Sequence, residues 1–149
     1  MQLTKHTDYA YRVLIYLAGM EEKRTTIQTI SDTYDLSKTH LMKVVNQLAN
    51  EGWIDSLRGK NGGICLGTSA ENINLRAVVE LMENNLDPIN CDAPLCHIKG
   101  VCLLKPIFLQ AQSEYLNYLG RYSLADIVNE GTIARMKYVK MKKNASDRI

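Results

Sequence analysis

The sequence predicts a mainly α protein with a small β wing: a winged helix-turn-helix domain, a cysteine-rich loop and a long dimerisation helix. Three observations predict this fold. Two short amphipathic segments precede a strand, a glycine-rich turn and a second strand; three of the four cysteines cluster after them; and a long helical pattern follows. With 149 residues and 46% hydrophobic content, the chain suits one small core plus an extension. We expect the winged helix over 1–85, the loop over 86–102, helices over 103–134 and a basic, disordered tail over 135–149.

Apolar residues that recur every three or four positions predict the first three helices. The first helix is expected from about Thr7, its N-cap, to Met20, and the second ends near Asp35. Ser37 is the expected N-cap of the third helix, which Gly52 ends. The polar face of this third helix can donate to phosphates or base edges through Ser37, Lys38, Thr39, His40, Lys43 and Gln47. Two closely joined helices with such a face predict a helix-turn-helix that binds double-stranded DNA.

A β-hairpin wing is predicted directly after this helix. Strands over 53–57 and 64–66 flank a glycine-rich turn over 58–63. The turn carries three polar side chains that can reach the DNA backbone or minor groove, namely Arg58, Lys60 and Asn61. We interpret Cys65, in the second strand, as a small buried apolar residue and not as a ligand.

Two further helices are well marked in the sequence. Asn74 is the expected N-cap of a helix that ends at about Asn85. A long helix over 104–119 tolerates Pro106 in its first turn, and its apolar residues recur near the spacing of a seam between two helices. This seam predicts a homodimer. A short segment over 123–128 then precedes the polar tail.

The cysteine loop carries the clearest chemical signal. Cys91, Cys96 and Cys102 are separated by four and then five residues, in a Pro- and Gly-containing segment that can curl around an iron–sulfur cluster. Structural zinc with His97 is an alternative, but the short paired spacings of zinc ribbons are missing. A thiol–disulfide switch is a second alternative, and it leaves one cysteine idle.

The composition disfavours membrane proteins and enzymes. We find neither a signal-type segment nor an apolar run that could cross a bilayer, and clustered reduced thiols fit the cytoplasm. The glycine-rich turn leads into a strand instead of a phosphate-binding helix, and no acid–base constellation is evident. The net charge of +2 is uninformative by itself, but basic residues gather at 38–43, at 58–60 and in the tail.

Four motifs together resemble the IscR/NsrR family of winged-helix regulators, and the resemblance covers almost the whole chain. The motifs are Thr7-Asp8-Tyr9-Ala10, Ser37-Lys38-Thr39-His40-Leu41, the wing turn over 58–63 and the three-cysteine loop. The resemblance implies a transcriptional repressor that binds operator DNA as a homodimer. IscR-type members with a two-iron cluster use a histidine three residues after the last cysteine, and this chain has Lys105 there.

The cysteine spacing instead resembles the nitric-oxide-sensing NsrR branch, whose four-iron cluster takes its last ligand from an N-terminal aspartate of the other subunit. Asp8 matches that position, although by itself it is an ordinary first-turn carboxylate that stabilises the helix dipole. The resemblance thus implies a 4Fe-4S cluster, with 2Fe-2S as the alternative, held by three cysteines and Asp8 of the partner subunit. Nitric oxide is then the signal that ends repression. An IscR-like sensor of cluster supply or redox state and a zinc-stabilised DNA-binding module stay open.

Overall fold

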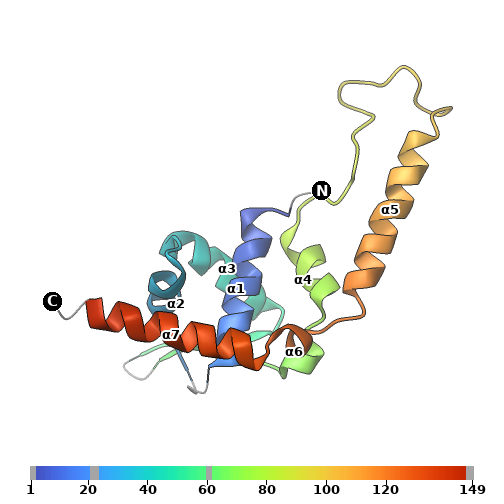
Figure 1. The fold of residues 1–149 in the computed structure, drawn as a ribbon. Coiled ribbons are helices and arrows are strands. Elements are labelled where there is room, and N and C mark those ends of the chain that lie inside the picture. Colours follow the sequence, from blue (N-terminus) through green and yellow to red (C-terminus); the bar gives the residue numbers. More distant parts are fainter. Residues whose placement is uncertain (1–2, 21–23, 60–61, 147–149) are drawn as a thin grey trace.

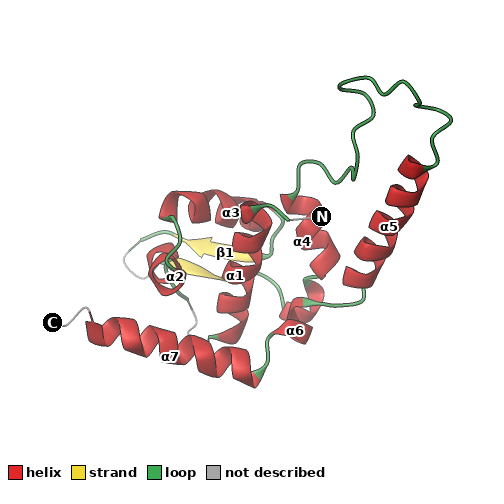
Figure 2. Cartoon of the chain, turned by 45° about the horizontal axis from the view of Figure 1, so that its top comes forward, coloured by secondary structure: helices red, strands yellow, loops and turns green. Residues whose placement is uncertain are grey.

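A computed structural model describes residues 3–20, 24–59 and 62–146, and it is mainly helical with one small sheet (Figure 1, Figure 2). The elements are α1 (Lys5–Gly19), α2 (Ile27–Tyr34), α3 (Lys38–Asn50), β1 (Ile54–Leu57), β2 (Gly63–Leu66), the 3-10 helix η1 (Ala70–Asn72), α4 (Leu75–Met82), α5 (Leu104–Leu119), α6 (Leu124–Ile127) and α7 (Glu130–Ser146). The predicted fold class, mainly α with a β wing, is confirmed. None of the described helices is long and apolar enough to cross a membrane.

Helix α1 begins earlier than the sequence predicts. Thr4, and not Thr7, is its N-cap, and the Thr4 side chain accepts a hydrogen bond from the backbone N–H of Thr7 at 3.5 Å. The reason is tertiary: the Thr7 side chain is fully buried and its hydroxyl donates to the carboxylate of Glu83 after α4. The predicted apolar stripe of α1 lies in the core, with Ala10, Val13 and Leu14 fully buried.

A tight turn joins α2 to α3 and forms the helix-turn-helix. Asp35 ends α2 in the left-handed conformation, with φ of 53°, which aspartate tolerates better than most residues. Both backbone groups of Leu36 are satisfied, because its N–H donates to Ser31 O at 3.0 Å and its carbonyl accepts from the Ser31 hydroxyl at 2.6 Å. Ser37 stands at the N-cap of α3, as predicted, although its side chain makes no capping hydrogen bond.

The wing is an antiparallel hairpin of β1 and β2, with Ile54 opposite Leu66. Thr25, before α2, widens this sheet through an isolated bridge in which its N–H and carbonyl bond Ile64 at 2.9 and 2.7 Å. Gly63 permits the close approach, because its φ is 147° and a Cβ there would lie 2.6 Å from the Thr25 carbonyl oxygen. The wing is therefore fixed to the segment that leads into the helix-turn-helix.

Helices α4 and α5 bracket an irregular segment over 83–103, which contains the predicted loop over 86–102. From here on, the cysteine loop means the whole segment over 83–103. Asn74 caps α4 as predicted, but the helix ends at Met82 and not near Asn85, because Glu83 is extended and its carboxylate reaches α1. Helix α5 has the predicted bounds, with Pro106 in its first turn. In Figure 1 the cysteine loop and the adjoining end of α5 project away from the packed helices.

The structure differs from the expected disordered tail, since the chain forms α7 through Ser146. Tertiary contacts that local periodicity does not reveal hold this helix. Met136 is buried against α1, where a Cβ on Gly19 would collide with its methyl group, and the Tyr34 hydroxyl donates to Met136 Sδ at 3.4 Å. Residues 147–149 of the predicted tail lie outside the described residues.

Candidate functional site

The cysteine loop is organised by short backbone hydrogen bonds. The N–H of Cys96 donates to the carbonyl of Cys91 at 3.1 Å, and the N–H of Cys102 donates to the carbonyl of Ile98 at 3.1 Å. Gly100 takes a φ of 97°, a conformation that favours glycine, between these two turns. The loop thus folds back on itself and brings its three cysteines toward one another.

All three cysteines line one hollow of about 520 Å³, whose other walls include Ile98 and, from the start of α5, Leu104 and Leu109. Each cysteine is half-buried and carries a free thiol. The backbone N–H of Leu104 donates to Cys102 Sγ at 3.4 Å. In the described part of the chain, no three acidic, cysteine or histidine side chains are yet close enough to hold a single ion.

These residues fit an iron–sulfur cluster in donor chemistry. Three thiols share one largely apolar hollow, none is used in a disulfide, and one sulfur already accepts a backbone N–H, as cluster sulfurs do. His97 is exposed and is not among the residues that line the hollow, so the zinc set of three cysteines and His97 has no support in this geometry. Lys99, which also lines the hollow, pairs with Asp92 and links the two halves of the loop.

Asp8 lies apart from the cysteines of its own chain. It is on α1, where both carboxylate oxygens accept from Arg12, with Nε to Oδ1 and Nη2 to Oδ2 each at 3.0 Å. Figure 1 shows α1 within the packed body and the cysteine loop projecting from it. An Asp8 ligand therefore has to come from a partner subunit, as the family resemblance implies, and it has to leave Arg12 or share its carboxylate.

The candidate DNA face on α3 is exposed at most of the predicted positions. Lys38, Thr39, His40 and Lys43 are exposed, as is Ser37 at the N-cap. Gln47 differs, because it is half-buried and its Oε1 lies 2.8 Å from Nε2 of His6 on α1. On the wing, Arg58 is exposed, whereas Lys60 and Asn61 lie outside the described residues. Contact of these α3 and wing residues with DNA stays a prediction. Cys65 is half-buried in β2.

The sequence profile of the Rrf2 family, described as iron-dependent transcriptional regulators, matches residues 3–130. The chain belongs to the Rrf2 family. As an Rrf2 protein it is a transcriptional regulator and not an enzyme. The predicted kinship with IscR-like regulators is confirmed at this level, and membership of the NsrR branch is not shown.

Solved structures share the fold of this Rrf2 protein. CymR (YrzC) of B. subtilis, the global cysteine regulator, is 22% identical with a TM-score of 0.71 over 86% of this chain and 96% of that chain. IscR of T. potens is 19% identical with a TM-score of 0.68 over 85% of each chain. The oxidized form of Staphylococcus aureus CymR is 23% identical with a TM-score of 0.64 over 83% of this chain and 93% of that chain.

Sequence reasoning missed a carboxylate clamp at the root of the cysteine loop. Glu83 accepts hydrogen bonds from the Thr4 N–H at 2.7 Å, the Thr4 hydroxyl at 3.1 Å and the Thr7 hydroxyl at 2.5 Å. Burial alone would raise the pKa of Glu83, but these bonds and the nearby His6 outweigh it and hold the pKa below its ordinary value. The clamp therefore fastens the start of the cysteine loop to the N-terminus of α1.

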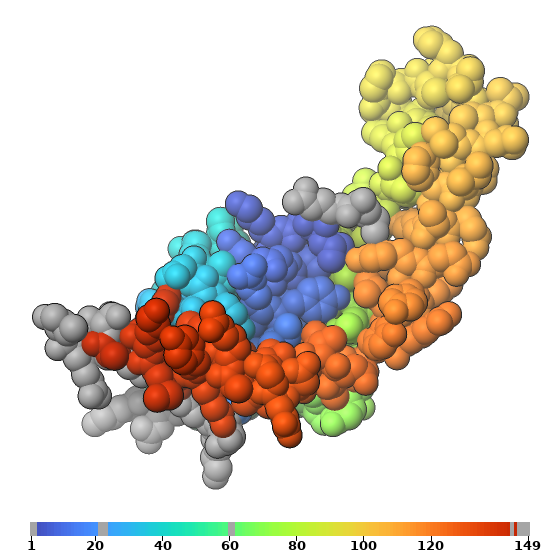
Figure 3. All heavy atoms as spheres, viewed as in Figure 1, coloured from blue at the N-terminus to red at the C-terminus, as the bar shows by residue number. Residues whose placement is uncertain are grey.

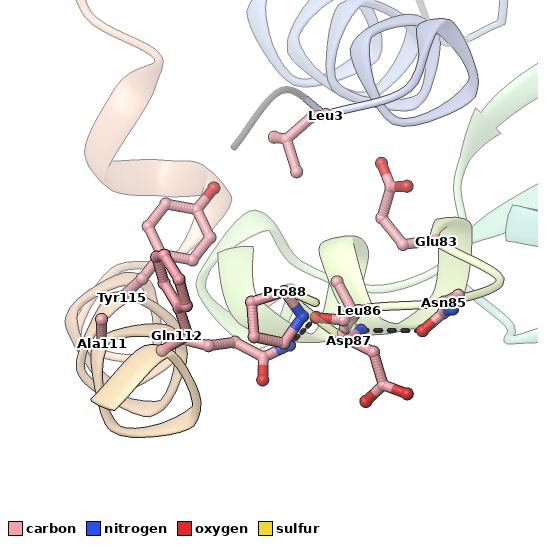
Figure 4. Close-up of a pocket in the computed structure, with 10 residues that line it drawn as sticks. Leu3, Glu83, Asn85, Leu86, Asp87, Pro88, Ala111, Gln112 and Tyr115 are labelled. Atoms are coloured by element: carbon pink, nitrogen blue, oxygen red, sulfur yellow. Dashed lines mark hydrogen bonds between the residues drawn. The ribbon is translucent and has the colours of Figure 1, made fainter. Parts of the chain in front are cut away.

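A second contact ties the loop to α5. The Gln112 side chain donates to the carbonyl of Leu86, in a pocket of about 590 Å³ that is also lined by Leu3, Pro88 and Tyr115 (Figure 4).

The wing is held by a further contact that sequence reasoning missed. Arg24, before α2, donates to the carbonyl of Gly63 at 3.2 Å and pairs with Asp55 at 2.6 Å. These side chains come together from distant parts of the chain, so no local motif announces them.

Proposed function

We propose that this Rrf2 protein is a cytoplasmic iron–sulfur-dependent repressor that binds operator DNA as a homodimer and leaves it when nitric oxide reacts with the cluster. The observation that carries the proposal is the hollow that Cys91, Cys96 and Cys102 all line beside the start of α5. The description of the family as iron-dependent supports it. The cysteine spacing and Asp8 favour the NsrR branch and a 4Fe-4S cluster, with 2Fe-2S as the alternative.

The three cysteine thiolates and Asp8 of the partner subunit would hold the cluster. When bound, the cluster would supply an iron atom with an oxygen ligand that exchanges more readily than a thiolate, a site open to a small diatomic such as nitric oxide. Ile98, Leu104 and Leu109 would provide apolar walls beside the cluster. Because Asp8 would come from the other chain, loss of this bond acts directly on how two subunits sit together.

Helix α5 is the proposed dimer element. Beyond its hollow-facing residues, it exposes Ile107 and Phe108, which are 62% and 41% accessible in the single chain. A run of exposed apolar residues on a long helix is typical of a surface that another protein covers. In a symmetric dimer, paired α5 helices would set the separation of the two α3 helices, and hence which spacing of DNA half-sites they fit.

The contacts at the loop root offer a physical route from cluster to DNA face. Glu83 fastens the loop to α1, and His6, two residues beyond the α1 N-cap, bonds Gln47 on α3. A shift of the loop would therefore be transmitted to α1 through Glu83, and from α1 to α3 through the contact between His6 and Gln47. We propose that cluster damage moves each winged helix as a unit, with its α3 and wing, relative to that of the partner subunit, by this route and by the altered dimer, and so lowers operator affinity.

The first test is anaerobic purification with iron and acid-labile sulfide analysis. Wild-type protein should be brown, with about four iron and four sulfide per chain for 4Fe-4S. Cys96→Ser should lose the cluster, and the matched variant Cys65→Ser should keep it. A full cluster in Cys96→Ser would remove the hollow from the mechanism, and colourless wild-type protein that contains zinc would favour the zinc-stabilised module.

The second test follows DNA binding by the cluster-loaded dimer, on genomic fragments that it selects. Nitric oxide should weaken binding by wild-type protein and leave any residual binding by cluster-free Cys96→Ser unchanged. Affinity that responds to reduction of the cluster but not to nitric oxide would favour the IscR-like alternative. Equal responses of the two proteins to nitric oxide would contradict a role for the cluster.

A further inference from the structure

Helix α7 lies beyond the part of the chain that the Rrf2 profile matches. The profile ends at residue 130, where α7 begins, and the helix continues to Ser146. It packs on α1 and α2, and the space-filling view shows it as a ridge across one face of the body beside the residues of α2 (Figure 3). The family match gives this helix no role.

The distribution of charge makes α7 important for any contact with DNA. Residues 1–129, which include the whole winged helix, contain 12 Lys and Arg against 14 Asp and Glu, whereas residues 130–149 contain 6 against 2. Residues 1–129 are thus slightly acidic, although the proposed partner is a polyanion whose phosphates dominate protein affinity. The net positive charge of the chain therefore comes entirely from residues 130–149.

Two contacts fix α7 beside the helix-turn-helix. Met136 is buried against α1 and accepts from the Tyr34 hydroxyl of α2. Near the other end, the Lys143 ammonium donates to the Asp32 carbonyl and the Asp35 carboxylate. Asp35 belongs to the turn that leads directly into α3, so the basic end of α7 is held close to the start of the proposed recognition helix.

The outward faces of α7 carry the remaining positive groups. With Met136 and Lys143 turned inward, helical spacing places Arg135 and Lys142 on one flank and Lys137 on the opposite one. All three side chains are exposed, and the Arg135 guanidinium lies 5.3 Å from the ring centroid of Tyr138. Positive groups on a helix anchored at a DNA-reading element are suited to phosphates next to the bases that the element reads.

We propose that α7 is a second DNA-contacting element, which binds backbone phosphates that flank the site occupied by α3 and the wing. The inference rests on the DNA-binding part of the proposed function and needs neither the cluster nor nitric oxide. It assigns to α7 an electrostatic contribution that is independent of base sequence, so it should be seen equally on random and operator DNA.

The test compares two double variants that keep both anchors. One is Arg135→Gln/Lys142→Gln, and the other is Lys137→Gln/Lys140→Gln, in which Lys140 is the half-buried lysine three residues after Lys137. The matched control, Arg76→Gln/Arg121→Gln, removes the same charge where the start of α4 contacts the end of α5. Affinity for a random-sequence duplex is measured against potassium chloride concentration. Each phosphate contact contributes about 0.9 to the log–log slope, so at least one α7 variant should lose roughly two units per bound chain, and the control should match wild type.

Slopes that agree with wild type in both α7 variants would overturn the proposal. A wild-type protein that shows no salt-dependent affinity would instead overturn the DNA-binding function itself, so the two failures are distinguishable. Acetylation of lysines in the unmodified protein, followed by mass spectrometry, covers the case of a variant that misfolds. Lys137 or Lys142 should become less reactive when the duplex is bound while Lys99 stays unchanged, and equal reactivity of the α7 lysines with and without DNA would also overturn it.

Discussion

The winged helix and the cysteine loop differ in how much apolar surface each of them buries within the single chain. In the winged helix, apolar side chains from α1, α3 and α4 meet in one core where Val13, Leu14 and Leu48 are fully buried. In the cysteine loop, Val101 and Leu103 are 82% and 76% exposed, and contacts such as the Asp92–Lys99 pair lie at the surface. The winged helix therefore has a complete hydrophobic core of its own. The cysteine loop instead carries candidate metal ligands next to exposed apolar side chains.

The difference shows which parts of the function a single chain can contain. The DNA-facing surface depends on the orientation of α3, and a close-packed core fixes that orientation before any partner arrives. The cysteine loop buries little by itself, so its order depends on what binds there, a cluster and a second subunit in our proposal. A region with few buried contacts opens at low free-energy cost, which suits a sensor.

The largest expected effect separates the two regions directly. Leu48→Ala, in the core, should lower the free energy of unfolding by about 2 to 5 kcal/mol, because it removes buried methyl groups and leaves a cavity. Val101→Ala, in the loop, should change it by less than about 0.5 kcal/mol in cluster-free monomer. Urea unfolding of both variants provides the measurement. A large loss in monomeric Val101→Ala would show that the loop belongs to the folding core.

A smaller loss is expected at the clamp that joins the two regions. Thr7→Val keeps the shape of a fully buried side chain but removes a hydroxyl that donates to Glu83. The weakened clamp should cost about 1 to 3 kcal/mol of unfolding free energy, again measured in urea. Thr39→Val, on the exposed face of α3, is the matched control and should be nearly neutral. Equal effects would mean that the hydroxyl contributes nothing specific.

Local sequence signals predicted most elements, but they failed where a contact with a residue distant in the sequence determines the start of a helix or its packing. The bounds of α5 follow from its apolar spacing and from Pro106, which fits only a first turn. The start of α1 was misplaced because Thr4 and Thr7 are both good caps, and Glu83, 76 residues beyond Thr7, determines which one turns inward. Helix α7 was missed because its burial against α1 rests chiefly on Met136 and not on a repeating stripe.

The candidate site shows the same limit. The three cysteines and the exposed face of α3 were predictable, because their spacing is local. Gln47 was grouped with the DNA-facing residues by helical periodicity, which is blind to His6 on another helix. Asn46 is exposed one residue earlier and was left out of the predicted set, although helical spacing places it beside Lys43. Its position makes it a further candidate for base contact.

On the DNA-facing side, Lys43→Ala should flatten the salt dependence of duplex binding. Lys43 is exposed on α3, and loss of one phosphate contact in each subunit should lower the log–log slope by roughly two units per dimer. Arg121→Ala, beyond α5, is the control and should leave the slope unchanged. If Lys43→Ala has the wild-type slope, the phosphate-facing side of α3 has been assigned to the wrong residues.

The clamp should also give the folded state a modest dependence on acid. The pKa of Glu83 is lower in the folded protein than in the unfolded chain, so its stabilising effect is fully present above the ordinary pKa and is lost as pH falls through the folded value. Unfolding free energies measured between about pH 6 and pH 3 should fall less steeply in Glu83→Gln than in wild type. Parallel curves would assign the acid sensitivity to other carboxylates.

The smallest effect concerns a local imperfection in the packed region. The side chain of Tyr16 is fully buried, yet its hydroxyl has no hydrogen-bond partner among the residues that the structure describes. A buried hydroxyl without a partner loses its hydrogen bonds to water and gains none from the protein. Tyr16→Phe should therefore be neutral or stabilise the fold by up to about 1 kcal/mol. Tyr11→Phe, on the same helix, is the matched control, because the Tyr11 hydroxyl donates to the carbonyl of Leu75 at 2.7 Å. That variant should lose about 0.5 to 1.5 kcal/mol in the same urea experiment. A loss in Tyr16→Phe as large as in Tyr11→Phe would mean that the Tyr16 hydroxyl does find a partner in solution.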